Sequence, residues 1–212
     1  MNVLSVKRVN DFRNEPLLNI VSLQLDSLAK QKLTFTPWPV FSYKPDVYFS
    51  IAHNSTHILL KYFVEEKTIR AVNTLTNSAV WEDSCVEFFI SFNKGVSYYN
   101  VEFNCIGTGL IGYGKSKTDR ELLLPDVVSQ VKSMAVTIPS NNNNICWQLT
   151  LTIPVEVFIY TAISSLKQTD CIANFYKCGD LLPDPHFVAW SNIQSVEPNF
   201  HLPEFFGKLV FE

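Results

Sequence analysis

The 212-residue chain is poor in glycine, with 7 residues, and contains no repeated segment, so a fibrous or low-complexity protein is excluded. It also lacks a cluster of Lys and Arg, and its 17 basic residues are outnumbered by 20 acidic ones, which gives a net charge of −3. Binding of nucleic acid by a positive surface is therefore not expected. No apolar run is long enough to span a membrane, so we expect no membrane partner.

The sequence shows neither a signal peptide nor a regular cysteine pattern. Its start lacks a continuous apolar region followed by a small-residue cleavage site. There are five cysteines, and no pair has the CxxC spacing, which argues against a disulfide framework or a zinc site. Cys85 and Cys105 could approach each other across a hairpin, but buried reduced thiols are the better interpretation. The localisation stays open, although free thiols favour the cytoplasm.

Short strands dominate what the sequence does contain. Aromatic residues make up 13% of the chain, including 16 Phe and 8 Tyr, and these residue types favour strands. Alternating segments recur at Val47–Ile51, His57–Glu65 and Ile145–Ile153, without a long amphipathic helix. We therefore predict one domain over residues 1–212, an all-β fold in which two antiparallel sheets form a jelly-roll-like sandwich with short helical turns.

The N-terminal residues 1–45 lack a clear periodicity. We expect an irregular segment packed on the sandwich, in which Leu17–Leu25 is compatible with either a short strand or a helix. Farther along, Asn141–Asn144 is expected to form a polar turn. Trp147 lies on the apolar face of Ile145–Ile153, the clearest half-buried strand, and is predicted to be a core residue.

A β-hairpin with two unlike faces is predicted over Val80–Asn104. The chain turns near Asn93-Lys94-Gly95, where glycine can supply a positive φ angle. Strand side chains alternate between faces, so each strand separates apolar from polar residues. The apolar face carries Val86, Phe88, Ile90, Phe92, Tyr99, Val101 and Phe103. The polar face carries Trp81, Asp83, Cys85, Glu87, Tyr98, Asn100, Glu102 and Asn104.

The pairing register of this hairpin follows from matching the faces. The most direct register sets Glu87 opposite Glu102 and Cys85 opposite Asn104, whereas a slip of two residues sets Glu87 opposite Asn104. Like charges opposite each other are unfavourable in a sheet. We therefore expect a cation, a basic side chain or a hydrogen-bonding ligand beside these acids, the alternative being a solvated outer face.

The same alternation selects a core and one unusual lysine. The predicted core consists of Phe88, Ile90, Val101, Phe103, Trp147, Leu149 and Leu151. Lys177 shares a strand face with Ala173 and Phe175, which is not an obviously solvated face. A partly buried ammonium needs an acidic partner or a ligand. We predict that Lys177 pairs with Glu87 or Glu102 and offsets their repulsion.

Five ordered blocks of the sequence are VWEDSCVEFFISF, YYNVEFNCIGT, NFYKCGD, PHFVAWSNI and PNFHLPEFFGKLVFE. At this spacing they resemble the family 9-like carbohydrate-binding modules, β-sandwich domains related to the wider DOMON-like group. The resemblance runs from about Asp46 to Glu212. It implies non-catalytic binding of a carbohydrate, such as the end of a mono- or oligosaccharide. It also implies a structural calcium ion, whose ligands it does not assign to positions here, and no other cofactor.

In sugar-binding members of that family, two tryptophans clamp a sugar ring and a carboxylate bonds to its hydroxyls. The resemblance implies that Trp81 and Trp190 form the clamp and that Glu87 is the carboxylate. The candidate site also includes three polar residues, Glu102, Asn104 and Lys177. The chemistry suits a sugar, because indole packs against C–H bonds while acids and amides bond to the rim hydroxyls.

Three alternatives stay open. Glu87 and Glu102 could form the carboxylate pair of a glycoside hydrolase, although nothing divides them into an acid and a base. Haem binding, which some DOMON-like domains perform, needs an axial Met or His. The candidate ligands are Met134, His53, His57, His186 and His201. A protein-interaction sandwich without sugar binding is the third alternative.

Overall fold

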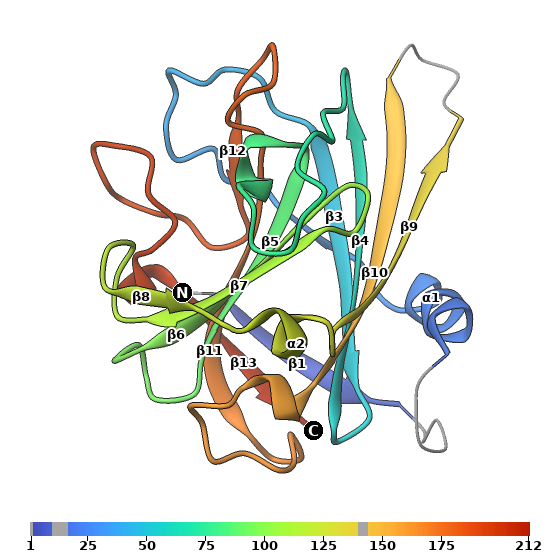
Figure 1. The fold of residues 1–212 in the computed structure, drawn as a ribbon, viewed down its shortest axis with the longest axis vertical. Coiled ribbons are helices and arrows are strands. Elements are labelled where there is room, and N and C mark those ends of the chain that lie inside the picture. Colours follow the sequence, from blue (N-terminus) through green and yellow to red (C-terminus); the bar gives the residue numbers. More distant parts are fainter. Residues whose placement is uncertain (1, 10–16, 140–143) are drawn as a thin grey trace.

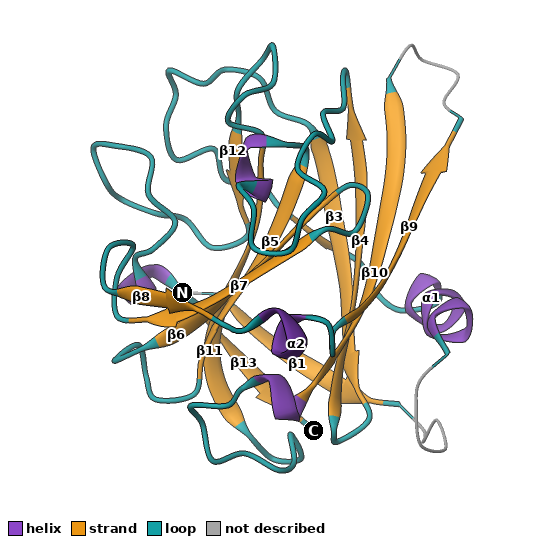
Figure 2. Ribbon diagram, in the orientation of Figure 1, coloured by secondary structure: helices purple, strands orange, loops and turns teal. Residues whose placement is uncertain are grey.

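The computed structural model describes residues 2–9, 17–139 and 144–212, and Figure 1 shows strands that face each other in two layers. Strands dominate this part of the chain, and the helices in it are short (Figure 2). Residues 141–143 of the expected polar turn lie outside the described residues. Within the described part of the chain, no helix is long and apolar enough to cross a membrane.

One layer, here called sheet A, has the strand order β8-β7-β6-β5-β11-β13. Its strands are β8 (Arg120–Leu122), β7 (Gly109–Gly114), β6 (Tyr98–Asn104), β5 (Cys85–Ser91), β11 (Asp170–Cys178) and β13 (Gly207–Phe211). The short strand β12 (Phe187–Ala189) pairs with the end of β11 that β13 leaves free. The other layer, sheet B, has the order β3-β4-β10-β9, with β2 paired to β3. Its strands are β2 (Gln31–Lys32), β3 (Asp46–His53), β4 (His57–Glu66), β9 (Lys132–Ile138) and β10 (Ile145–Pro154).

Strand β1 (Val3–Arg8) joins the two sheets. Its first part, Val3–Val6, pairs with β13, and Lys7 and Arg8 pair with β3. Both pairings are parallel, so the predicted β-sandwich is confirmed but its purely antiparallel pairing is wrong at β1. The alternation of side chains specifies which face a residue occupies, and it carries no information on the direction of a neighbouring strand.

The N-terminal segment is more regular than the sequence suggested. Besides β1 and β2 it contains helix α1 (Leu18–Asp26), which resolves the ambiguity at Leu17–Leu25 in favour of a helix. Helix α1 buries Val21 and Leu25 against sheet B, and its Asp26 accepts a 2.6 Å hydrogen bond from the Lys61 ammonium. The expectation of an irregular segment over residues 1–45 is therefore wrong. The sequence did not reveal β1, because this strand buries only Val6 and shows little alternation.

The main core lies between the sheets, and all seven predicted core residues belong to it. The rings of Phe49 in β3 and Phe175 in β11 stack across the layers with centroids 3.8 Å apart. The β5–β6 hairpin has the expected register, with Glu87 opposite Glu102. Its turn places Gly95 at a φ angle of 88°, in the left-handed region that favours glycine. A second helix, α2 (Pro125–Val128), packs against β7.

The outer face of sheet A is covered and not solvated. Loops that follow β2 and β12 bring Trp38, Ile193 and Phe206 over β5, β6 and β11. These residues form a second apolar cluster with Phe89 and Tyr176. The polar face of the hairpin is therefore buried, and the solvated-face interpretation does not hold.

Candidate functional site

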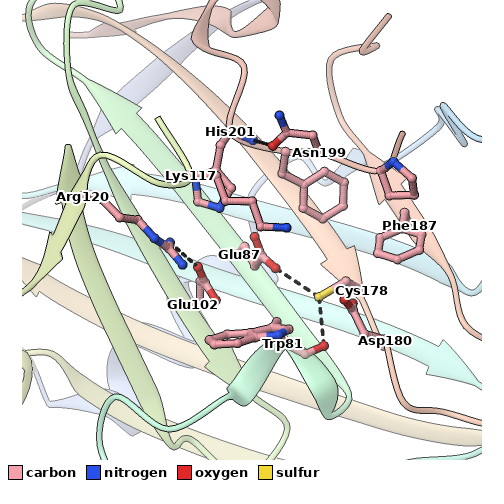
Figure 3. A pocket seen from close by; sticks show the side chains of 12 residues that line it. Trp81, Glu87, Glu102, Lys117, Arg120, Cys178, Asp180, Phe187, Asn199 and His201 are labelled. Atoms are coloured by element: carbon pink, nitrogen blue, oxygen red, sulfur yellow. Dashed lines mark hydrogen bonds and ion pairs between the residues drawn. The ribbon is translucent and has the colours of Figure 1, made fainter. Parts of the chain in front are cut away.

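A cavity of about 350 Å³ opens at the edge of this second cluster, on the outer face of sheet A. Figure 3 shows it with Trp81 on one side of Glu87, and His201 and Asn199 on the other. The lining residues come from five strands, one 3-10 turn and the loops between them. They are Trp81, Glu87, Glu102, Lys117, Arg120, Cys178, Asp180, Phe187, Pro198, Asn199, Phe200 and His201.

Trp81 lies on the short 3-10 turn Val80–Glu82, and not on strand β5 as the alternation implied. Val80 is buried, and the Trp81 carbonyl accepts a 3.1 Å hydrogen bond from the Asp180 N–H and lies 3.6 Å from the Cys178 sulfur. These contacts hold the indole beside the end of β11. Trp81 is half-buried, so one part of its ring remains available to a ligand.

Asp83, next to this turn, anchors the loop that precedes it. Its carboxylate accepts backbone hydrogen bonds from Val72 at 3.1 Å and Asn73 at 2.9 Å, and it pairs with Arg70. Asn104 adds a 3.0 Å bond from its side-chain amide. Although burial opposes ionisation, these hydrogen bonds hold the pKa of Asp83 below its usual value. The ionised carboxylate therefore fixes the position of the turn that carries the indole.

The opposed acids form the floor of the cavity and have different partners. Glu102 Oε1 accepts hydrogen bonds from Asn100 at 2.7 Å and from Arg120 at 3.3 Å, whereas its buried Oε2 has no partner among the described residues. Glu87 Oε1 accepts a 3.0 Å bond from the Cys178 thiol. Burial, and then the charge of Glu102, raise the pKa of Glu87 well above its usual value. Burial also raises the pKa of Glu102, and Arg120 opposes the shift.

The rim combines two cations with a neutral histidine and a third acid. Lys117 and Arg120 line one side of the cavity. Burial, together with these two charges, lowers the pKa of His201 to about 3, and its Nδ1 lies 2.9 Å from the Tyr98 hydroxyl. Burial raises the pKa of Asp180 to about 6. At neutral pH the cavity therefore offers both hydrogen-bond donors and acceptors to a ligand.

Lys177 points away from the cavity, into the space between the sheets. Its ammonium lies 2.9 Å from Glu66 Oε2 and 2.8 Å from His186 Nε2, and the Trp147 indole donates a 2.6 Å bond to Glu66 Oε1. The expected acidic partner is thus present, but the predicted pairing with Glu87 or Glu102 is wrong. Neighbouring strand residues face opposite ways, so Cys178 reaches the cavity and Lys177 cannot.

Trp190 and Asn104, two further residues of the predicted site, do not line the cavity. Trp190 is 5% exposed, and its ring meets the rings of Phe49 and Phe175 edge-on in the main core. A side chain at Gly207 would collide with this indole. Asn104 instead uses its amide to bond Asp83 and the Asn73 carbonyl. The expectation that Trp190 is the second wall of a clamp does not fit this packing.

Comparison with known proteins places the chain in a family. A family model described as carbohydrate-binding family 9 matches residues 19–211. The chain belongs to carbohydrate-binding family 9. No curated protein matches it. The crystal structure of a candidate carbohydrate-binding protein from Bacteroides uniformis is similar over 99% of both chains, with 40% identity and a TM-score of 0.92.

Two structures of a family 9 module share the fold at low identity. They are forms of a carbohydrate-binding module from Caldicellulosiruptor kristjanssonii, one in complex with glucose and one with cellotriose. Each is 9% identical to the chain and covers 100% of it, with TM-scores of 0.62 and 0.61 and coverage of 96% and 94% of the module. The relation of the chain to the DOMON-like group stays a prediction.

The resemblance implies a structural calcium ion. The described residues form one cluster of potential metal-ligand side chains, and this cluster does not suit calcium. That cluster consists of Cys85, Glu87 and Cys178. Calcium takes oxygen ligands, and two of these three donors are thiols. The cluster therefore does not fit calcium, and a calcium site elsewhere stays a prediction.

Several residues of the cavity were missed by reasoning from the sequence. Lys117, Phe187, Phe200 and His201 lie in loops or in a three-residue strand, where no periodicity assigns a face. The only available signal was that Phe187, Phe200 and His201 fall within the blocks PHFVAWSNI and PNFHLPEFFGKLVFE.

Proposed function

We propose that the cavity binds a carbohydrate without catalysing a reaction, with one sugar ring lying against Trp81. The observation that carries this proposal is that one cavity combines a half-buried indole with the buried Glu102 Oε2, which has no partner among the described residues. An indole face suits the C–H bonds of a pyranose, and an unpartnered oxygen suits a hydroxyl donor. Complexes of family 9 modules with glucose and cellotriose support a glucose-containing ligand.

Phe187 takes the place that Trp190 was expected to fill. It lines the cavity, is half-buried, and is held edge-on by Trp38 with ring centroids 5.7 Å apart. Phe200, behind it, is 7% exposed and stacks on Tyr176 at 4.1 Å. Phe187 therefore presents more of its ring to a ligand than Phe200 does. We assign it as the second apolar surface for the sugar.

The acids of the cavity support binding in preference to glycoside hydrolysis. A glycosidase needs one carboxylic acid and one ionised carboxylate in distinct environments. Here burial raises the pKa of both Glu87 and Glu102, and each accepts a hydrogen bond from a neighbouring side chain. The family relation also favours carbohydrate binding over hydrolysis and over haem binding. Incubation with aryl glycosides should release no phenol.

A glycan array followed by calorimetric titration of the best ligand tests the proposal. Trp81→Ala and Phe187→Ala should each weaken binding by about fivefold or more, because truncating an aromatic anchor of a binding site costs more than about 1 kcal/mol. Glu87→Gln should change the preference among sugars, since it replaces an oxygen acceptor by a donor. Tyr160→Ala, an exposed aromatic residue outside the cavity, is the matched control. Unchanged affinity in both cavity variants would place the sugar elsewhere.

A further inference from the structure

Three potential metal ligands meet at the floor of the cavity, on the outer face of sheet A. Cys85 in β5 and Cys178 in β11 are directly opposite each other on antiparallel strands. Glu87 follows Cys85 by two residues and lies on the same face. The two sulfur atoms and a carboxylate oxygen of Glu87 all lie within 4.8 Å of one another. The closest of these contacts joins Cys178 Sγ and Glu87 Oε1 at 3.0 Å.

This arrangement has the features of a zinc site with one open position. Tetrahedral zinc binds thiolate sulfur at about 2.3 Å and carboxylate oxygen at about 2.0–2.2 Å, so its ligands stand close together as these do. Cys85 is fully buried, whereas Glu87 and Cys178 line the cavity. A metal held by the three side chains would therefore face the cavity with its fourth position. Thiolates select zinc over calcium and magnesium.

Glu87 also has no basic partner among the described residues. Glu87 is 4% exposed and lies directly opposite Glu102, yet no Lys or Arg of the described residues forms an ion pair with it. The nearby cation, Arg120, bonds to Glu102. Two buried carboxylates that are ionised side by side are costly unless one takes up a proton or a positive charge accompanies them. A divalent cation between Glu87 and the two sulfur atoms would supply that charge.

We propose that Cys85, Cys178 and Glu87 bind one Zn²⁺ ion, with water or a ligand oxygen in the position that faces the cavity. Each thiol, and Glu87 where it carries a proton, releases that proton to solvent as the metal binds, because only the thiolate and the carboxylate are ligands. The site does not depend on the carbohydrate, and its test uses no sugar. If the protein did not bind sugar, the zinc proposal would still hold. If the zinc proposal failed, the sugar-binding proposal would be unaffected.

Titration of the reduced, metal-free protein with Co²⁺ and Cd²⁺ tests the site. Both ions should give thiolate-to-metal charge-transfer absorption at a stoichiometry of one ion per chain, and Zn²⁺ should displace Co²⁺. Cys178→Ser should weaken Zn²⁺ binding by at least about tenfold. Cys105→Ser is the matched control, because Cys105 is a buried thiol outside the cluster, and it should bind the metal as the unmodified protein does.

Glu87→Gln provides a second variant in case Cys178→Ser does not fold, as judged by circular dichroism. It should keep the thiolate absorption and weaken Zn²⁺ binding. The proposal is overturned if the unmodified protein shows no charge-transfer band with either ion. It is equally overturned if the band persists unchanged in folded Cys178→Ser, which would assign the metal to other thiols.

Discussion

The two faces of sheet A both bury charge, but they do so in opposite ways. On the inner face, Lys177 contacts Glu66 and His186, and Glu66 also bonds to Trp147. On the outer face, Glu87 has a thiol as its neighbour and no cation of its own among the described residues. The inner charges are therefore balanced within the protein, whereas the outer acids can still bind a cation or a ligand that is not part of the chain.

Two consecutive residues, Lys177 and Cys178, produce this difference. Their side chains point to opposite faces of β11, one into the sandwich and one into the cavity. Burial, followed by the charge of Lys177, lowers the pKa of His186 to about 3, so this histidine is neutral beside the ammonium. The ion pair on the inner face therefore stabilises the fold, whereas the acids on the outer face line the candidate site.

Removal of the inner ammonium should have the largest effect. Lys177→Met should lower the free energy of unfolding by about 3–5 kcal/mol, because Glu66 would remain buried without its cation. The double variant Lys177→Met with Glu66→Gln should recover part of that loss, since no charge is then left unpaired. Denaturant unfolding measures both. A loss below about 1 kcal/mol in the single variant would show that the inner cluster does not depend on this pair.

The two tryptophans of the expected clamp should separate stability from binding. Trp190→Leu should cost about 2–3 kcal/mol, because it leaves a cavity against Phe49 and Phe175. Trp81→Leu, the matched change on the outer face, should cost only about 1 kcal/mol of stability and should instead weaken sugar binding. Thermal unfolding combined with calorimetric titration compares them. Equal losses of stability would contradict the separation between the two faces.

The smallest effect should come from Asp180, at the rim of the cavity. Burial raises its pKa to about 6, so the folded protein holds this proton more tightly than the unfolded chain does. The carboxylate therefore costs stability above pH 6, and that cost disappears as the pH falls below the ordinary carboxyl range. Asp180→Asn should gain about 1 kcal/mol or less at pH 7.5, because solvent screens this half-exposed group. It should gain nothing at pH 3.5, and an equal gain at both values would refute this account.

The sequence predicted what side-chain alternation determines. The hairpin register followed from matching apolar faces, and the structure sets Glu87 opposite Glu102 as expected. Alternation also assigned Trp147 to the core and Lys177 to a face that is not solvated, and both are buried. These inferences required only the two-residue period of strand side chains and the position of the turn.

Alternation could not identify partners across the fold or residues carried by loops. Glu66, the partner of Lys177, lies in the other sheet, and nothing in either segment links the two. Trp190 directly follows a three-residue strand, which is too short to establish a face. His201 reaches the cavity because the loop after β12 folds back over sheet A, and Phe187 reaches it from β12 itself, opposite Cys178.

Strand β1 also constrains how the molecule can assemble. It pairs with β13 through Val3–Val6 and with β3 through Lys7 and Arg8, so the junction of the layers combines an early segment of the chain with a late one. Contacts between distant segments require closure of a long loop, which slows folding. During synthesis β1 must wait for β13, and the edge of β11 that pairs with β13 stays unpaired meanwhile. We expect slow, late closure of the sandwich, with that exposed edge as the point at which nascent chains associate.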